Sequence, residues 1–269
     1  MNRSGNDNGK PGSGERRRVS EFRVDPHVKV LDERIAARAK RRGLDALVYA
    51  PHFTRLPDIE SRARRFSDGE LLVVPARELF TGSWRNRKHV LAVGLSEPVP
   101  DFLSLEATMR ELDRQSAAVL APHPEFATVS LDATDLGRYG GIVDAVEVYN
   151  PKHWRRHNDR ARDLARETGL PAFGSSYAHL GGSVGEVWTA FEEPLDSATA
   201  LVEAFREGAA RRVFRRRGRS HALRCRAEFA HLAWENTWEK FERVVLRGRE
   251  PTHPRHPAYG GRFEDDVVY

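Results

Sequence analysis

The sequence predicts an α/β fold in which a mostly parallel sheet closes, or nearly closes, into a barrel that carries a helical extension at its C-terminus. From Phe22 to about residue 207, short apolar segments alternate with amphipathic ones, as in strands joined by helical crossovers. About seven strands follow one another without a sign that their order reverses. This favours a barrel over an open, doubly wound sheet.

The expected elements follow from apolar runs and helix-capping signals. Strands are predicted, in chain order, at 22–28, 46–49, 71–74, 90–95, 117–121, 142–148 and 172–174. Helices are predicted at 32–42, 57–66, 103–114, 132–138, 151–167, 197–207 and 222–246. Gly43 and Gly169 each follow a predicted helix as a C-terminal cap, and Pro151 stands in the first turn of the fifth helix.

Three segments are expected: a disordered basic tail (1–20), the barrel (21–210), and a basic helical extension with an irregular tail (211–269). The tail at 1–20 is rich in Gly, Asn, Ser and Arg without an apolar period. It also has no apolar stretch of the kind found in signal peptides. The single cysteine, Cys225, rules out an internal disulfide and suits a reducing cytoplasm, which is the predicted location. No apolar run reaches the roughly 20 residues that span a bilayer, so no membrane partner is expected.

A carboxylate and an imidazole lie between the predicted strands 71–74 and 90–95, one near each strand. Glu78 is expected just past the end of the strand 71–74, and His89 at the start of the strand 90–95. Rigid strands can hold such a pair as half of a metal site. Taken alone, the pair is equally consistent with a solvated glutamate and a surface histidine.

The same residue types recur at strand ends along the chain. The recurring residues are His27, His52, Glu78, His89, His123 and His179. The carboxyl ends of barrel strands converge on one face, so these side chains are expected to meet. Their mixed nitrogen and oxygen donors suit zinc, manganese or iron rather than calcium.

Successive motifs around these residues resemble those of the PHP (polymerase and histidinol phosphatase) family. The motifs are DPHVKV at 25–30, APH at 50–52, ARE at 76–78, KHVLAVGL at 88–95, APHP at 121–124, VEVYN at 146–150 and SSYAHLGGSVGEVWTAF at 175–191. The resemblance covers roughly residues 22–207. It implies a distorted seven-stranded β/α barrel that holds up to three divalent metals and hydrolyses phosphate esters. Small phosphomonoesters, nucleoside bisphosphates and nucleic-acid ends are the implied substrates.

This chain departs from the family pattern at four places. Lys29 stands where the family has the second histidine of Asp-x-His-x-His, and the Ser-Asp-Gly stretch that follows is missing. Pro51 replaces the aspartate before the second-strand histidine, and Tyr177 replaces the aspartate of Ser-Asp-Ala-His.

By this resemblance the three ions are affected unequally. Lys29 and Tyr177 remove ligands from the ion that His27 and Glu78 would help to hold. A second ion keeps Glu78, His89 and His123, whereas a third keeps only His52 and His179. One or two ions of zinc, manganese or iron are therefore expected rather than three.

Two functions remain open. In the first, the protein is a metal-dependent phosphoesterase in which metal-activated water attacks phosphorus and His179 or His52 transfers a proton. Lys29 then holds the phosphate together with an arginine from the set Arg77, Arg85 and Arg87. In the second, the barrel is catalytically degenerate and binds nucleic acid or a protein. The complete Glu78/His89/His123 set favours the enzyme, while Lys29 and Tyr177 favour the alternative.

The expected partner is a phosphorylated small molecule or a nucleotide. Eight arginines between residues 211 and 226 add nucleic acid as a second candidate. Such charge runs are more often solvated faces, here with Glu192, Glu193, Glu203 and Glu207 nearby to pair with. Trp234, Trp238 and Phe241 recur near helical spacing and indicate core packing or the seam of a homodimer.

Overall fold

The computed structural model describes residues 21–82, 86–126, 129–231 and 250–268. Nine strands form one sheet in the order β7-β6-β5-β4-β3-β2-β1-β8-β9. They are β1 Phe22–Val28, β2 Ala46–Tyr49, β3 Leu72–Thr81, β4 Lys88–Val93, β5 Ala118–Ala121, β6 Ala145–Tyr149, β7 Ala172–Gly174, β8 Val187–Phe191 and β9 Arg211–Arg215. The helices are α1 Glu33–Arg41, α2 Leu56–Phe66, α3 Leu105–Arg114, α4 Ala133–Tyr139, α5 Arg155–Thr168 and α6 Ala198–Arg206.

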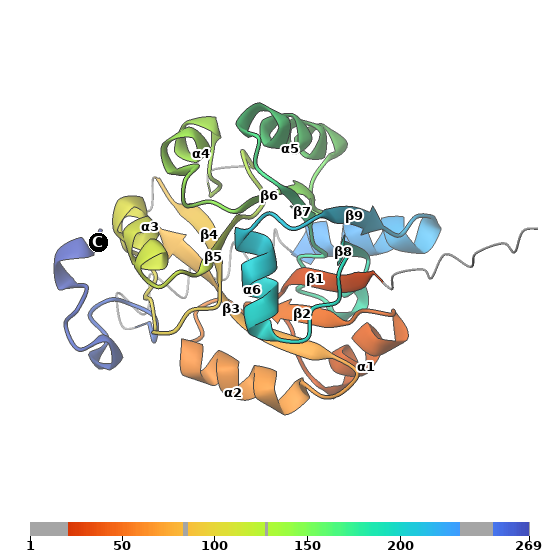
Figure 1. Cartoon of the computed structure of the whole chain (residues 1–269), viewed down its shortest axis with the longest axis horizontal. Helices are drawn as coiled ribbons and strands as arrows, with labels where there is room; N and C mark the ends of the chain where they lie inside the picture. The colour runs from red at the N-terminus through yellow and green to blue at the C-terminus, as the bar shows by residue number, and fades with distance from the viewer. Residues whose placement is uncertain (1–20, 83–85, 127–128, 232–249, 269) are drawn as a thin grey trace, which may run out of the picture.

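The two ends of the sheet meet at β7, so the sheet is a nearly closed barrel (Figure 1). Gly174 of β7 donates its N–H to Thr189 Oγ1 of β8 at 3.0 Å, and the same hydroxyl donates to the Gly174 carbonyl at 3.0 Å. A Cβ at Gly174 would lie 2.4 Å from Val213 Cγ1 of β9, so only glycine permits this approach. The barrel predicted from the sequence, with its C-terminal helical extension, is confirmed.

The sheet is mixed, and the expectation of a mostly parallel sheet was wrong in this respect. The pairs β1/β2, β2/β3, β5/β6 and β6/β7 are parallel. The pairs β3/β4, β4/β5, β1/β8 and β8/β9 are antiparallel. The sequence interpretation missed β8 and β9. The charged run Arg211–Arg215 conceals an edge strand that pairs with β8 beyond the predicted barrel boundary at residue 210.

Short helices cover the outside of the barrel and α6 closes one end of it (Figure 1). One apolar cluster joins Val24, Ala46 and Ala118, at or near the beginnings of their strands, to Leu201 and Phe205 of α6. The opposite, carboxyl ends of the strands are therefore the ends at which polar side chains can gather. No helix among the described residues is long and apolar enough to cross a bilayer.

Helix α5 begins at Arg155, four residues later than predicted. Residues 151–153 form a turn instead, because polar side chains hold the backbone there: Asn150 Oδ1 accepts from Lys152 N at 2.9 Å and Asn158 Oδ1 accepts from Asn150 N at 2.9 Å. This turn brings Lys152 into the barrel mouth. The C-terminal extension is helical over 219–231, and Trp234, Trp238 and Phe241 lie outside the described residues.

Candidate metal centre

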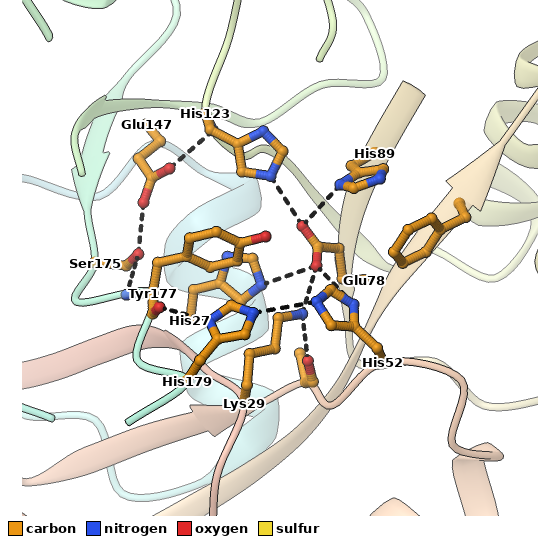
Figure 2. A network of polar contacts seen from close by, with 12 residues as sticks. His27, Lys29, His52, Glu78, His89, His123, Glu147, Ser175, Tyr177 and His179 are labelled. Carbon is orange, nitrogen blue, oxygen red and sulfur yellow. Dashed lines mark hydrogen bonds and ion pairs between the residues drawn. The ribbon is translucent and has the colours of Figure 1, made fainter. Parts of the chain in front are cut away.

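All six predicted ligand residues converge on one point at the barrel mouth (Figure 2). β1 supplies His27, β3 supplies Glu78 and β4 supplies His89, while His52, His123 and His179 follow β2, β5 and β7. Glu78 lies inside β3, not past its end, because β3 runs on to Thr81 as a hairpin partner of β4. Its carboxylate is fully buried and lies at the centre of the group.

One carboxylate oxygen of Glu78 faces two imidazoles. Oε1 lies 3.0 Å from His123 Nε2 and 3.3 Å from His89 Nδ1. Donor atoms that share a tetrahedral zinc at bonds of about 2.0–2.1 Å stand about 3.3 Å apart. The three ligand atoms lie within 4.8 Å of one another, so Glu78, His89 and His123 form a cluster that can hold a divalent metal. Neither ring nitrogen of buried His89 has a hydrogen-bond partner among the described residues, which also fits a ligand.

Ser130 determines which nitrogen of His123 carries the proton. The hydroxyl of Ser130 donates to the Phe126 carbonyl at 2.8 Å, so at 3.0 Å from His123 Nδ1 it acts as the acceptor. When the ring carries a single proton, that proton is on Nδ1, and the lone pair on Nε2 points at Glu78 Oε1. Two acceptors 3.0 Å apart repel each other unless a cation lies between them. The arrangement therefore fits a bound metal.

The other oxygen of Glu78 is taken by Lys29. Lys29 Nζ donates to Oε2 at 2.5 Å and to the Ala50 carbonyl at 2.6 Å. His52 Nδ1 and His27 Nε2 lie 3.3 and 3.7 Å from the same oxygen. One oxygen of the carboxylate, Oε1, thus faces the two imidazoles that can bind metal, whereas Oε2 is bound by an ammonium group.

Burial keeps four of the imidazoles neutral. It lowers the pKa of His27 to about 3 and that of His89 to about 4. Burial likewise lowers the pKa values of His52 and His179 well below the ordinary range, with Lys29 adding to the effect at His52 and Lys152 at His179. Burial alone would raise the pKa of Glu78, but Lys29 and the surrounding imidazoles hold it well below its usual range. Neutral imidazoles around an ionised carboxylate are the protonation states that metal binding requires.

Tyr177 packs over the centre from the loop after β7. Its buried ring lies 4.6 Å from the His27 ring and 5.2 Å from the His123 ring, and its backbone has a φ of +43°. Asp25 holds this loop by accepting from Ser176 N at 2.9 Å and Gly185 N at 3.0 Å. Burial raises the pKa of Asp25 to about 7 although these bonds oppose the shift.

Sequence reasoning missed Lys152 and Glu228. Lys152 is buried, contacts His179 Nδ1 and lies 4.4 Å from the Tyr177 ring centroid. Glu228 lies 3.4 Å from Lys152 Nζ and accepts from Leu180 N at 2.9 Å. The only signal in the sequence was a lysine two residues after Asn150, where a helix was expected.

Glu147 supports the backbone and the loop beside the centre. One of its oxygens accepts from His123 N at 2.8 Å, and the other accepts from Ser175 Oγ at 2.5 Å.

The predicted phosphate-binding arginines do not gather at this centre. Neighbouring strand residues point to opposite faces, so Arg77 points away from Glu78 and pairs with buried Asp101 at 2.9 Å. Its assignment to substrate was wrong. Arg85 lies outside the described residues, and Arg87 precedes β4.

The comparisons with known proteins agree with this geometry. A family model described as PHP-associated matches residues 155–210, and with the fold it confirms the PHP resemblance of the motifs. The fold is similar to that of PsfC from Pseudomonas syringae PB-5123, with a TM-score of 0.59 and 21% identity over 79% of this chain and 99% of that one. It is also similar to the lesion-specific endonuclease PfuEndoQ from Pyrococcus furiosus, with a TM-score of 0.55 and 15% identity over 72% of this chain and 57% of that one. No curated protein matches the sequence.

Proposed function

From a PHP-type barrel with a PHP-associated region at residues 155–210, we propose that this protein is a metal-dependent phosphoesterase that uses one divalent ion. Glu78, His89 and His123 would hold the ion. One observation supports the proposal most directly. In the tautomer set by Ser130, two acceptors, His123 Nε2 and Glu78 Oε1, face each other at 3.0 Å. Zinc, manganese and iron all suit these donors.

The ion would supply a Lewis acid for the phosphoryl oxygens and lower the pKa of a water molecule toward 7. Lys29 supplies a fixed positive charge on the far side of the Glu78 carboxylate, 2.5 Å from Oε2. An ammonium there occupies the place in which the family resemblance puts another ion. We therefore propose that Lys29 takes over part of the charge of a second metal and leaves a one-ion centre.

Three side chains behind the centre form a line that can hold or move a proton. The Lys152 ammonium can donate hydrogen bonds but not accept them, so His179 Nδ1 accepts from it, although the Tyr177 carbonyl lies 3.0 Å from the same nitrogen. The His179 proton is then on Nε2, which lies 3.3 Å from His52 Nε2. His52 in turn directs Nδ1 toward Glu78 Oε2 at 3.3 Å. His179 Nε2 is accordingly the proposed donor to the leaving oxygen of a phosphate ester.

The substrate class is proposed as small phosphomonoesters, nucleoside bisphosphates or nucleic-acid ends. The competing function, a barrel that binds a partner without turnover, is favoured by one observation: the Tyr177 ring and the Lys29 ammonium fill space beside His27. The competing function was predicted with nucleic acid or a protein as the partner. The two functions differ in whether metal is retained and turnover follows.

The experiment is metal analysis of full-length protein purified without an affinity tag or chelator. Wild type is compared with His89→Ala and His123→Ala. His157→Ala serves as a control that removes a histidine outside the Glu78 cluster. About one zinc, manganese or iron ion per wild-type and control chain, lost from both ligand variants, supports the centre. Hydrolysis is then measured on p-nitrophenyl phosphate, nucleoside 3′,5′-bisphosphates and oligonucleotides.

Wild-type protein that stays metal-free after loading refutes the enzyme. Stoichiometric metal without hydrolysis of any of these substrates favours the binding function.

A further inference from the structure

A second charged cavity of about 480 Å³ lies outside the ring of histidines. It opens where the residue after α1, the start of β8 and the first turn of the helix at 219–231 come together. Arg42, Arg216, Arg217 and Arg224 line it, together with Glu186 at its base. None of these residues contacts Glu78, so the cavity is separate from the metal centre.

The cavity has more positive charge than its carboxylate can neutralise. Glu186 is buried, and its carboxylate accepts from Arg42 at 2.8 Å, Arg224 at 2.7 Å and His221 Nδ1 at 2.9 Å. Four lining guanidinium groups against one carboxylate leave three positive charges when His221 is neutral. Burial and then the nearby Arg42 lower the pKa of Arg216, as expected where like charges are crowded. An anion in the cavity would relieve this repulsion.

Three of the four guanidinium groups, those of Arg42, Arg216 and Arg224, are held in place before any ligand arrives. Arg216 donates to the Gly185 carbonyl at 3.2 Å and to the Arg42 carbonyl at 3.4 Å, and its Cζ lies 5.8 Å from the Trp188 ring centroid. Fixed guanidinium forks match the oxygens of a phosphate group and lose little entropy when they bind it. Ser220 adds a hydroxyl from the first turn of the helix.

We propose that this cavity binds the phosphate group of a small molecule of about nucleotide size. Its volume lies in the range of small-ligand sites. Three other arginines of the run are used elsewhere and do not extend the cavity into a track for a nucleic-acid backbone. Arg211 lies over the Phe205 ring and donates to the Ala172 carbonyl, Arg212 pairs with Glu21, and Arg215 donates to Tyr149 Oη.

Arg217 offers a clean test because it is exposed and forms no hydrogen bond or ion pair with the described residues. Arg219, two residues away and also exposed, does not line the cavity and is the matched control. Full-length, chelator-treated protein is titrated calorimetrically with pyrophosphate, adenosine 5′-monophosphate and a 12-residue single-stranded DNA. Removing the metal prevents these ligands from binding through an ion at the Glu78/His89/His123 centre.

The proposal expects pyrophosphate and the mononucleotide to bind wild type, and Arg217→Ala to weaken both about tenfold. Arg219→Ala should change either affinity less than twofold. Equal effects of the two variants, or no binding by wild type at millimolar ligand, overturn the proposal. DNA that binds at least tenfold more tightly than the mononucleotide also overturns it, in favour of a nucleic-acid surface.

Discussion

Replacing Ser130 by alanine tests the argument on which the metal centre rests. The hydroxyl accepts from His123 Nδ1 at 3.0 Å and donates a hydrogen bond to the Phe126 carbonyl at 2.8 Å. Without it, nothing among the described contacts keeps the His123 proton on Nδ1, and Nε2 is no longer reserved as a ligand. Loss of such an outer partner typically lowers metal affinity about 10–100-fold, or about 1.4–2.8 kcal/mol.

The assay is competition for zinc between the protein and a fluorescent chelator at pH 7.5. Ser67→Ala is the matched control, because Ser67 Oγ also accepts a hydrogen bond, from Val73 N at 2.9 Å, but lies between α2 and β3. We expect Ser130→Ala to weaken zinc binding at least tenfold, Ser67→Ala to leave it unchanged, and Ser130→Thr to restore most of it. A Ser130→Ala variant that binds zinc within twofold of wild type would refute the tautomer argument.

Three further outcomes are expected. Lys29→Met leaves the Glu78 carboxylate uncompensated and should lower the unfolding free energy of metal-free protein by about 3–5 kcal/mol in urea; a loss below about 1 kcal/mol would show that the ammonium does not neutralise Glu78. Because burial lowers the pKa of His89 to about 4, protonation of His89 competes with metal only near and below that pH. Metal content after dialysis should thus stay constant from pH 7.5 to 5, and loss beginning near pH 6.5 would contradict a buried, neutral ligand. Gly94→Ala should lower the free energy of unfolding by about 1–3 kcal/mol, since φ is +82° and a Cβ would lie 2.5 Å from a valine side chain of α6. Gly141→Ala, with no atom within 4 Å of its Cβ, is the control, and equal stability of the two variants would contradict the steric argument.

The alternation of apolar and amphipathic segments was sufficient to predict the barrel and most of its elements. Strand β1 and strand β7 were predicted at their observed bounds. The missed strand β9 has three arginines in five residues, and it belongs to the sheet because of pairing with β8, which sequence periodicity does not contain. Pro151 was a misleading helix signal, because side chains of Asn150 and Asn158 hold that backbone in a turn.

The candidate ligands could also be found from the sequence, since parallel strands bring their carboxyl ends together and antiparallel β4 carries His89 near its start, beside the end of β3. Which oxygen of Glu78 faces which partner could not be predicted, because it depends on χ angles set by packing. The same holds for Arg77, whose place one residue before Glu78 turns it toward Asp101 and away from the centre.

By itself, then, the sequence determined a barrel with imidazole and carboxylate donors at one mouth, and the substitutions Lys29 and Tyr177 within that mouth. Only the tertiary structure decided that Lys29 sits on Glu78 Oε2 while Oε1 faces His89 and His123. It also decided that Lys152 and Glu228, 76 residues apart in the chain, meet behind His179. The physical reason is that periodicity and capping are local properties of the chain. The charge on a buried carboxylate, in contrast, is balanced by whichever groups the closed barrel brings within a few ångströms.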